Sequence, residues 1–260
     1  MSEYVWQTCV FAHTLVSDKA MLLSKFQNQD TRICILTGAG ISAESGLPTF
    51  RGGGENAVWK GMPFEQISSV QMVNSDVDKV WEWFDYRRGV YKNCLPNAAH
   101  IALAEIETRF EVVSLITQNV DGLHNRAGSK QAIELHGNIN RARCTKCGKV
   151  YLMKFDDIPH TPETCADCDA KVRPDVVLFG EALPHGTFEK ARLAAENATL
   201  FLLIGTSAMV YPAAFLPELA KRNGAYLVEI NPEETPLTSL CDESFRGKAC
   251  EIVPNLFSSS

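Results

Sequence analysis

Short apolar runs alternate with amphipathic segments along most of the chain after residue 30. An apolar run that ends in turn residues is typical of a strand buried on both faces of a parallel sheet. Helical patterns separate these runs, so we expect an α/β fold in which helices cover both faces of one parallel sheet. The predicted strands are residues 32–36, 112–116, 132–135, 175–179, 200–204 and 225–230.

The segments between these strands divide into helices and one irregular stretch. Residues 64–94 are rich in aromatic side chains, and we predict helices there and at residues 97–109, 187–197 and 212–222, with a helical turn at 42–46. Residues 50–62 contain three consecutive glycines and show neither a helical nor a strand period, which predicts a mobile loop.

Small or polar residues follow each of the predicted strands. In open parallel sheets, ligands bind outside the carboxyl ends of the strands, so these clusters together outline one site. The clusters are Gly38–Gly40, Gln118–Asp121, His136–Gly137, Gly180–Glu181, Gly205–Ser207 and Asn231–Pro232.

The segment Gly38-Ala39-Gly40-Ile41-Ser42-Ala43 has the spacing G-x-G-x-x-A between a strand and a helix. Glycines in such a turn bring backbone N–H groups against a diphosphate, although a plain strand-to-helix turn is the alternative. A dehydrogenase carries an acidic residue about 20 positions further on, at the end of the next strand. That residue is missing here, because the predicted loop at residues 50–62 occupies the region. We therefore expect a dinucleotide, but not ordinary hydride transfer.

Four of the nine cysteines form two close pairs with the spacing Cys144-x2-Cys147-x17-Cys165-x2-Cys168. Four thiolates so spaced predict a tetrahedral zinc site that is closed to substrate and therefore structural. The alternative is redox chemistry of a C-x-x-C pair, which two spaced pairs make less favourable.

His136 follows a strand and precedes a glycine, a position from which an imidazole can act as a general base near neutral pH. Taken alone, a structural histidine is the better interpretation, and the same ambiguity holds for His100 and His124. Asn119 and Asp121 are also compatible with simple turn formation.

Composition narrows the function classes. The chain has 260 residues, 45% of them hydrophobic, and a net charge of -6, which predicts a folded protein without the basic surface of a nucleic-acid or membrane-surface binder. No apolar run reaches 18 residues and no secretory signal opens the chain. An odd number of cysteines without a signal points to free thiols, and hence to the cytoplasm.

Taken together, these motifs resemble the sirtuin family of NAD-dependent protein lysine deacylases over residues 30–255. The segment from Gly38 to Arg51, the segment Thr117–His124, His136-Gly137, the two cysteine pairs, Gly205–Ser207 and Asn231-Pro232 occur in sirtuin order. Val210-Tyr-Pro-Ala-Ala214 and Pro96-Asn-Ala-Ala-His100 are most similar to the bacterial and mitochondrial desuccinylase branch.

The resemblance implies a Rossmann-like parallel-sheet domain with a small zinc-binding module and a helical module inserted, all within one catalytic domain. The Rossmann-like part would comprise residues 30–55, 96–137 and 173–255, the helical module residues 56–95 and the zinc module residues 138–172.

The resemblance also implies roles for individual residues. His136 would be the catalytic base, with Asn119 and Asp121 beside it. The residues implied to bind NAD are Gly38, Ala39, Gly40, Ser42, Ala43, Glu44, Thr49, Phe50, Arg51, Ala57, Gln118, Asn119, Val120, Asp121, Gly205, Thr206, Ser207, Asn231, Pro232, Glu233 and Ala249.

The implied reaction converts NAD, water and an acyl-lysine into nicotinamide, an O-acyl-ADP-ribose and free lysine. An extended peptide would add as a strand along residues implied to bind substrate, namely Val177, Phe179, Gly180, Glu181 and Val210. We expect a monomer that binds no nucleic acid and no membrane. The alternatives are an ADP-ribosyltransferase or NAD glycohydrolase on the same scaffold, and an NAD sensor without turnover.

One position departs from the desuccinylase branch, whose members hold an acidic acyl group with a tyrosine and an arginine three residues apart. Here those positions are Phe84 and Arg87. Arg87 retains the charge-assisted contact, while Phe84 cannot donate a hydrogen bond, although the neighbouring Tyr86 is a possible replacement. The departure favours hydrophobic acyl groups.

Overall fold

The computed structural model describes residues 26, 30–49, 58–160 and 162–256. Its largest element is a six-stranded parallel sheet that begins with a buried strand at the N-terminal side of the described chain. The strand order is β11 (Glu243–Phe245), β10 (Tyr226–Ile230), β9 (Leu200–Ile204), β1 (Arg32–Thr37), β4 (Val112–Thr117) and β5 (Ile133–Glu134).

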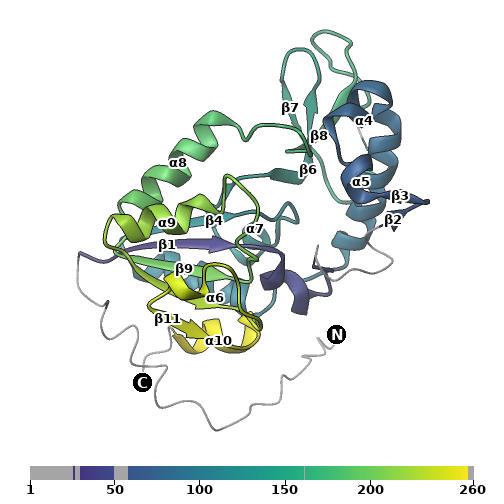
Figure 1. Ribbon diagram of the computed structural model, residues 1–260. Helices are drawn as coiled ribbons and strands as arrows, with labels where there is room; N and C mark the ends of the chain where they lie inside the picture. The colour runs from purple at the N-terminus through teal and green to yellow at the C-terminus, as the bar shows by residue number, and fades with distance from the viewer. Residues whose placement is uncertain (1–25, 27–29, 50–57, 161, 257–260) are drawn as a thin grey trace.

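Helices cover both faces of this sheet, as the alternating side chains of β1 show. Ile33 and Ile35 pack with α6 (Ala98–Arg109) and α10 (Ala249–Leu256), whereas Cys34 and Leu36 pack with α8 (His185–Glu196) and α9 (Phe215–Arg222). Figure 1 shows the two helix layers on opposite sides of the strands. The three-layer α/β architecture expected from the apolar runs is therefore confirmed.

A second part of the molecule lies beyond the carboxyl ends of these strands (Figure 1). It has its own apolar core, in which Trp81 and Phe84 pack with Ile139 and Val172. Its elements are the hairpin β2 (Val58–Trp59) and β3 (Met62–Pro63), the helices α3 (Phe64–Ile67), α4 (Val70–Ser75) and α5 (Val77–Lys92), and the antiparallel strands β6 (Gly137–Cys144), β7 (Val150–Leu152) and β8 (Val172–Val176).

The predicted parallel strand at residues 175–179 is wrong. β8 ends at Val176 and pairs antiparallel with β6 in the separate three-stranded sheet. The sixth parallel strand is β11, which sequence analysis did not predict because its three residues, Glu-Ser-Phe, carry no apolar run. An apolar run shows that a segment is buried, but it does not identify the strand with which the segment pairs.

Buried polar contacts hold α5 against residues 157–160, which belong to the loop that follows β7. Arg88 is fully buried and donates to Asp85 at 2.8 Å and to the backbone oxygen of Asp157 at 2.7 Å. His160 bonds Asp85 and stacks on Trp81 with ring centroids 3.9 Å apart. These contacts hold in place the helix that carries Phe84 and Arg87.

Among the described residues, no helix has the length and apolarity to span a membrane.

Candidate active site

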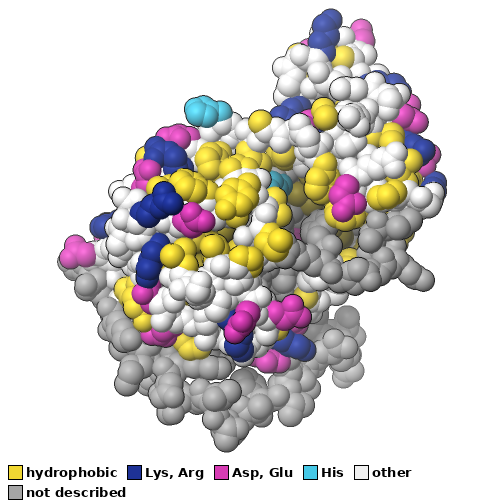
Figure 2. Space-filling view, in the orientation of Figure 1, with side chains coloured by type: hydrophobic (Ala, Val, Ile, Leu, Met, Phe, Trp, Pro, Cys, Tyr) yellow, Lys and Arg dark blue, Asp and Glu magenta, His cyan; other side chains and the backbone are white. Residues whose placement is uncertain are grey.

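A cavity of about 1190 Å³ lies between the carboxyl ends of the parallel strands and the second part of the molecule. Figure 2 shows hydrophobic side chains gathered on the side of this hollow that α8 and α9 cover. Its lining comes from segments far apart in the sequence, among them the loops after β1, β4, β5, β9 and β10. The site outlined by the strand ends is thus a single cavity.

The glycine-rich loop after β1 packs directly on the loop after β9. The N–H of Gly40 donates to the oxygen of Gly205 at 2.8 Å, and a Cβ on Gly40 would lie 2.7 Å from the Cα of Gly205. Only glycine allows this approach. The backbone of Gly38–Gly40 lines the cavity, and the 3₁₀ helix η1 (Ala39–Ser45) begins within this turn.

Hydrogen bonds join the loops at the sheet edge into one surface. Gln118 donates through Nε2 to Thr206 Oγ1 at 2.8 Å, and Asn231 donates through Nδ2 to the backbone oxygen of Thr206 at 2.9 Å. The loops after β4, β9 and β10 are therefore held in fixed relative positions, as recognition of an extended dinucleotide requires.

A buried polar cluster supports this loop from behind. Asn119 donates through Nδ2 to the backbone oxygen of Gly38 at 3.0 Å and to Ser42 Oγ at 3.2 Å. Ser42 in turn donates to Asp121 Oδ2 at 2.9 Å, and Asp121 Oδ1 accepts from the N–H of Leu123 at 2.8 Å. Burial raises the pKa of the Asp121 carboxyl against the effect of these bonds. Asn119 lines the cavity, whereas Ser42 and Asp121 lie one layer behind it.

His100 and His124 belong to the same buried layer. His100 Nε2 lies 3.4 Å from Ser42 Oγ, and His124 Nε2 lies 3.0 Å from Thr37 Oγ1. Burial lowers the pKa of His100 to about 4 and that of His124 to about 3, so both rings are neutral at neutral pH. They serve as neutral hydrogen-bonding groups of the interior, and neither lines the cavity.

His136 differs from these two histidines because it is half-buried and lines the cavity. Its Nδ1 lies 2.9 Å from the backbone oxygen of Gln118. A carbonyl oxygen can only accept, so Nδ1 carries the proton and Nε2 carries the lone pair. Burial lowers the pKa of His136, partly offset by this bond, so that the basic form dominates at neutral pH.

The turn after His136 requires glycine. Gly137 has φ = 81°, and a Cβ there would lie 2.1 Å from the backbone oxygen of Asp175. The backbone oxygen of His136 also accepts from the N–H of Val177 at 2.9 Å. The histidine is thereby fixed between the parallel sheet and the segment that follows β8.

Phe84 and Arg87 of α5 line the opposite end of the cavity, together with Val176–Phe179. Tyr86, the phenol considered as a replacement, is 55% exposed and stacks on Trp83 outside the cavity. Instead, Arg87 Nη2 donates to Tyr91 Oη, one helical turn further along α5. Tyr91 was not among the site residues predicted from sequence, although the i, i+4 spacing of Arg87 and Tyr91 on a predicted helix was a usable signal.

The edge on which we expect a peptide to pair is partly occupied by the chain itself. The N–H of Phe179 donates to Ser68 O at 2.9 Å, and its oxygen accepts from Val70 N at 3.1 Å. The expected pairing at Phe179 therefore meets a backbone that already has partners. Gly180 and Val210 both line the cavity, and the side chain of Val210 is exposed.

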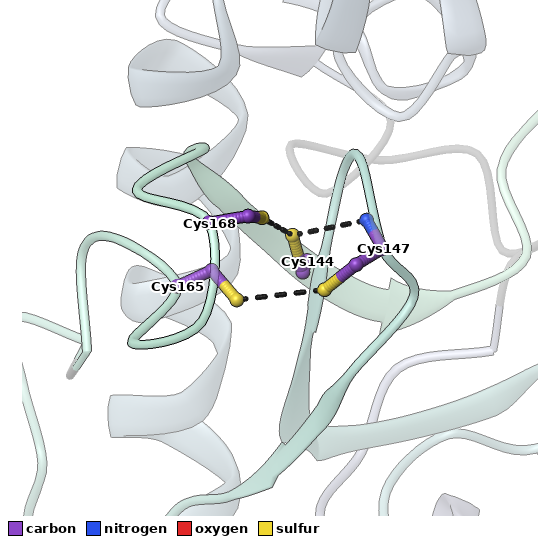
Figure 3. A group of neighbouring side chains, drawn as sticks. All are labelled: Cys144, Cys147, Cys165 and Cys168. Carbon is purple, nitrogen blue, oxygen red and sulfur yellow. Dashed lines mark hydrogen bonds between the residues drawn. The ribbon is translucent and has the colours of Figure 1, made fainter.

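The four predicted zinc ligands converge from the end of β6 with the turn that follows it, and from the loop before β8 (Figure 3). The sulfur atoms all lie within 4.8 Å of one another, with 3.5 Å between Cys144 and Cys168 and between Cys147 and Cys165. Tetrahedral zinc with bonds of about 2.3 Å separates its sulfur ligands by about 3.8 Å, so the cluster fits the ion. All four positions come from protein, which leaves none for substrate.

Tyr151 of β7 lies beside this cluster. Its Oη accepts from the N–H of Ala166 at 3.0 Å and lies 3.1 Å from Cys165 Sγ. Since the oxygen already accepts from Ala166, its hydrogen is directed to the sulfur.

The cavity brings together most of the residues predicted from sequence, and Phe50, Arg51 and Ala57 lie outside the described residues. Of the remaining residues predicted to bind NAD or substrate or to act in catalysis, Ser42 and Asp121 alone do not line it. The predicted residues that do line it are Gly38, Ala39, Gly40, Ala43, Glu44, Thr49, Phe84, Arg87, Gln118, Asn119, Val120, His136, Val177, Phe179, Gly180, Glu181, Gly205, Thr206, Ser207, Val210, Asn231, Pro232, Glu233 and Ala249.

Other lining residues were not predicted, notably Phe64, Ser68, Leu183, Phe188 and Lys248. They carry no motif, and only the arrangement of α3, α8 and α10 brings them to the cavity.

Comparisons with known proteins agree with this site. The Sir2 family profile matches residues 38–212. An NAD-dependent protein deacylase of Aquifex aeolicus is 45% identical over 221 residues, covering 85% of this chain and 92% of the relative. NAD-dependent protein deacylase 1 of Caldanaerobacter subterraneus is 47% identical over 224 residues, covering 86% and 92%.

Solved structures give the same result. A Sir2 homologue in complex with NAD superposes with a TM-score of 0.81 at 43% identity, covering 90% of this chain and 91% of that one. A mutant Sir2 homologue in complex with 2'-O-acetyl ADP ribose has a TM-score of 0.80 at 42% identity, covering 90% and 94%. A complex of Sir2 with a p53 peptide and NAD+ has a TM-score of 0.73 at 32% identity, covering 90% and 96%.

Proposed function

This chain belongs to the Sir2 family and is an NAD-dependent protein deacylase, and we propose that His136 is its general base and Arg87 its acyl-reading residue. It acts on acyl-lysine peptides, uses NAD as a co-substrate and holds a structural zinc ion between Cys144, Cys147, Cys165 and Cys168.

The observation that carries the proposal is the Nδ1 contact of His136 with Gln118 O. It leaves the lone pair on Nε2, on a ring that lines the cavity. A base of lowered pKa is ready at neutral pH to take a proton from a hydroxyl group brought into the cavity. The buried Asp121 touches Ser42 rather than the cavity, so we assign it the role of positioning the loop that carries Gly38–Gly40.

The loops around the cavity fit a dinucleotide by their donor groups. The backbone at Ala39 would face the diphosphate, and Thr206, Asn231 and Glu233 would lie along the adenosine side, near Ala249 at the start of α10. Bound NAD would supply the ribose, which loses nicotinamide and carries the acyl group away on one of its hydroxyl groups. The residues of this chain hold the two substrates together, exclude water and accept the proton at His136.

The acyl end of the cavity combines an apolar ring with a positive charge. Phe84 removes a hydrogen-bond donor and favours acetyl and longer aliphatic groups. Arg87 offers charge-assisted hydrogen bonds to an acyl carboxylate. We therefore propose measurable deacetylation, with weaker desuccinylation that depends on Arg87.

For the peptide, we propose pairing along Gly180 and Val210 on the two sides of the cavity. We leave Phe179 out of this pairing because its N–H and its oxygen are already bonded to Ser68 and Val70. Main-chain pairing gives affinity with weak dependence on peptide sequence.

Product analysis tests the proposed function. We expect incubation with NAD and an acetyl-lysine peptide to yield nicotinamide, O-acetyl-ADP-ribose and free lysine in equal amounts. ADP-ribosylated protein would instead identify a transferase, and free ADP-ribose without deacetylation would identify a glycohydrolase.

We further propose that the protein works as a monomer in the cytoplasm. The eight cysteines among the described residues form no disulfide, which supports a reducing compartment. Sedimentation at micromolar concentration tests the monomer.

A further inference from the structure

Arg87 is held in the acyl end of the cavity by an aromatic cage. Its guanidinium carbon lies 5.0 Å from the ring centroid of Tyr91, 5.5 Å from that of Trp83 and 5.8 Å from that of Phe84. Aromatic faces attract a cation without cancelling its charge. The cage therefore stabilises the Arg87 side chain at the cavity.

Tyr91 also supplies a directed contact, since its hydroxyl accepts from Arg87 Nη2. Tyr91 is 8% exposed, and burial raises its pKa, so the hydroxyl stays protonated and neutral. Arg87 lines the cavity but Tyr91 does not, which means that the phenol supports the guanidinium from the side away from the cavity.

The neighbouring Arg88 is a structural arginine of the same helix, and its surroundings differ from those of Arg87. It is fully buried, and its charge is paired with Asp85 at 2.8 Å. Arg87 is half-exposed, lines the cavity and is held there by the cage and the Tyr91 phenol. Of these two adjacent arginines, only Arg87 lines the cavity and can meet a ligand there.

We propose that Tyr91 is a positioning residue for acyl selection, holding the Arg87 guanidinium in the orientation that receives the carboxylate of an acidic acyl group. A long side chain fixed before binding loses less freedom when the ligand arrives. The inference rests on the proposed role of Arg87. It gives this chain a way to retain activity on acidic acyl groups although Phe84 has no hydroxyl.

The test uses Tyr91→Phe, which removes one oxygen and keeps the ring of the cage. The control is Tyr86→Phe, which removes an exposed phenol from the same helix. For each protein, kcat and KM are measured on matched acetyl- and succinyl-lysine peptides, alone and in an Arg87→Met background. If succinyl turnover is too slow, competitive inhibition of deacetylation by the succinyl peptide provides the comparison.

We expect Tyr91→Phe to lower succinyl kcat/KM about threefold to tenfold, mainly through KM, and to change acetyl kinetics less than twofold. Tyr86→Phe should leave both substrates unchanged. In the Arg87→Met background, Tyr91→Phe should no longer alter the ratio of the two substrates, because the group that it positions is gone.

Equal losses on both peptides, or an unchanged ratio, would overturn the role of Tyr91 while leaving that of Arg87 intact. If Arg87→Met itself leaves the ratio unchanged, both assignments fail, although deacetylation remains. Absence of deacetylation in the wild-type protein would instead contradict the proposed function as a whole.

Discussion

The Nδ1 atom of His136 lies 2.9 Å from the backbone oxygen of Gln118, which joins the proposed base to the loop that also contacts Thr206. One residue therefore connects the proton-accepting ring with the loops expected to hold NAD. The contact fixes the tautomer of the histidine as well as its place in the cavity.

The pH dependence of deacetylation should report this histidine. Its pKa is lowered by burial below the ordinary value of 6.5, so the basic form is lost only when the pH falls below that value. We expect the acidic limb of kcat/KM to have its midpoint below pH 6.5. A midpoint above 6.5 would contradict a buried, neutral base at this position.

Zinc should contribute to folding rather than to chemistry. Cys144→Ser removes one of four thiolate ligands, so we expect loss of bound zinc together with a lower melting temperature. Zinc content and thermal unfolding are measured on the same samples, with Cys241→Ser as the control outside the cluster. Full zinc occupancy and unchanged melting in Cys144→Ser would show that the cysteine is not a ligand.

Tyr151 should slow the release of zinc. Its hydroxyl is directed to Cys165 Sγ at 3.1 Å, and hydrogen-bond partners of ligands typically contribute about 10- to 100-fold in metal affinity. We expect Tyr151→Phe to release zinc to a coloured chelator about tenfold faster than wild type. Tyr226→Phe, which removes a phenol bonded to Glu243 at 2.7 Å, is the matched control, and equal release rates in both variants would exclude the effect.

The buried histidines should make the fold sensitive to acid. The pKa of His124 is about 3 in the folded protein against an ordinary value of 6.5, so the unfolded chain binds a proton that the folded protein does not. This contribution to stability is complete above pH 6.5 and is lost as the pH falls from there toward 3.

Urea unfolding between pH 5 and 7.5 measures this effect in wild type and in His124→Gln. Removing the titrating group should reduce the slope of the free energy of unfolding by up to about 1.4 kcal/mol per pH unit. Contributions of other groups, including the Asp121 carboxyl of raised pKa, are common to both proteins. Identical slopes would mean that His124 is not a buried neutral base.

Much of the parallel sheet was predictable because its central strands are buried on both faces. β1, β4, β9 and β10 are apolar runs between turn residues, and they occur within a residue or so of the predicted positions. Residues 175–179 were wrongly predicted as a parallel strand because they too form a buried apolar run. Val176 and Leu178 are buried, but in the core of the second part. Burial is encoded locally, whereas the pairing partner depends on the rest of the chain.

The site was predictable where a motif combines residue type with spacing, as in the four cysteines. It was not predictable where a contact depends on rotamers and packing. Phe84 and Arg87 could be named from sequence. The phenol that contacts Arg87 could not, because Tyr91 bonds Arg87 whereas Tyr86 is exposed to solvent, and the packing of α5 decides between the two tyrosines. Ser42 and Asp121 likewise carry motif positions, although they support the loop without lining the cavity.

The identity of His136 as the general base is the central claim, and one measurement tests it most directly. Deacetylation of an acetyl-lysine peptide by His136→Ala is compared with wild type in samples of equal zinc content, melting temperature and NAD binding. We predict a loss of about 10² to 10⁴ in kcat, the usual contribution of a general base. Near-normal turnover by the folded, NAD-binding variant would contradict the account.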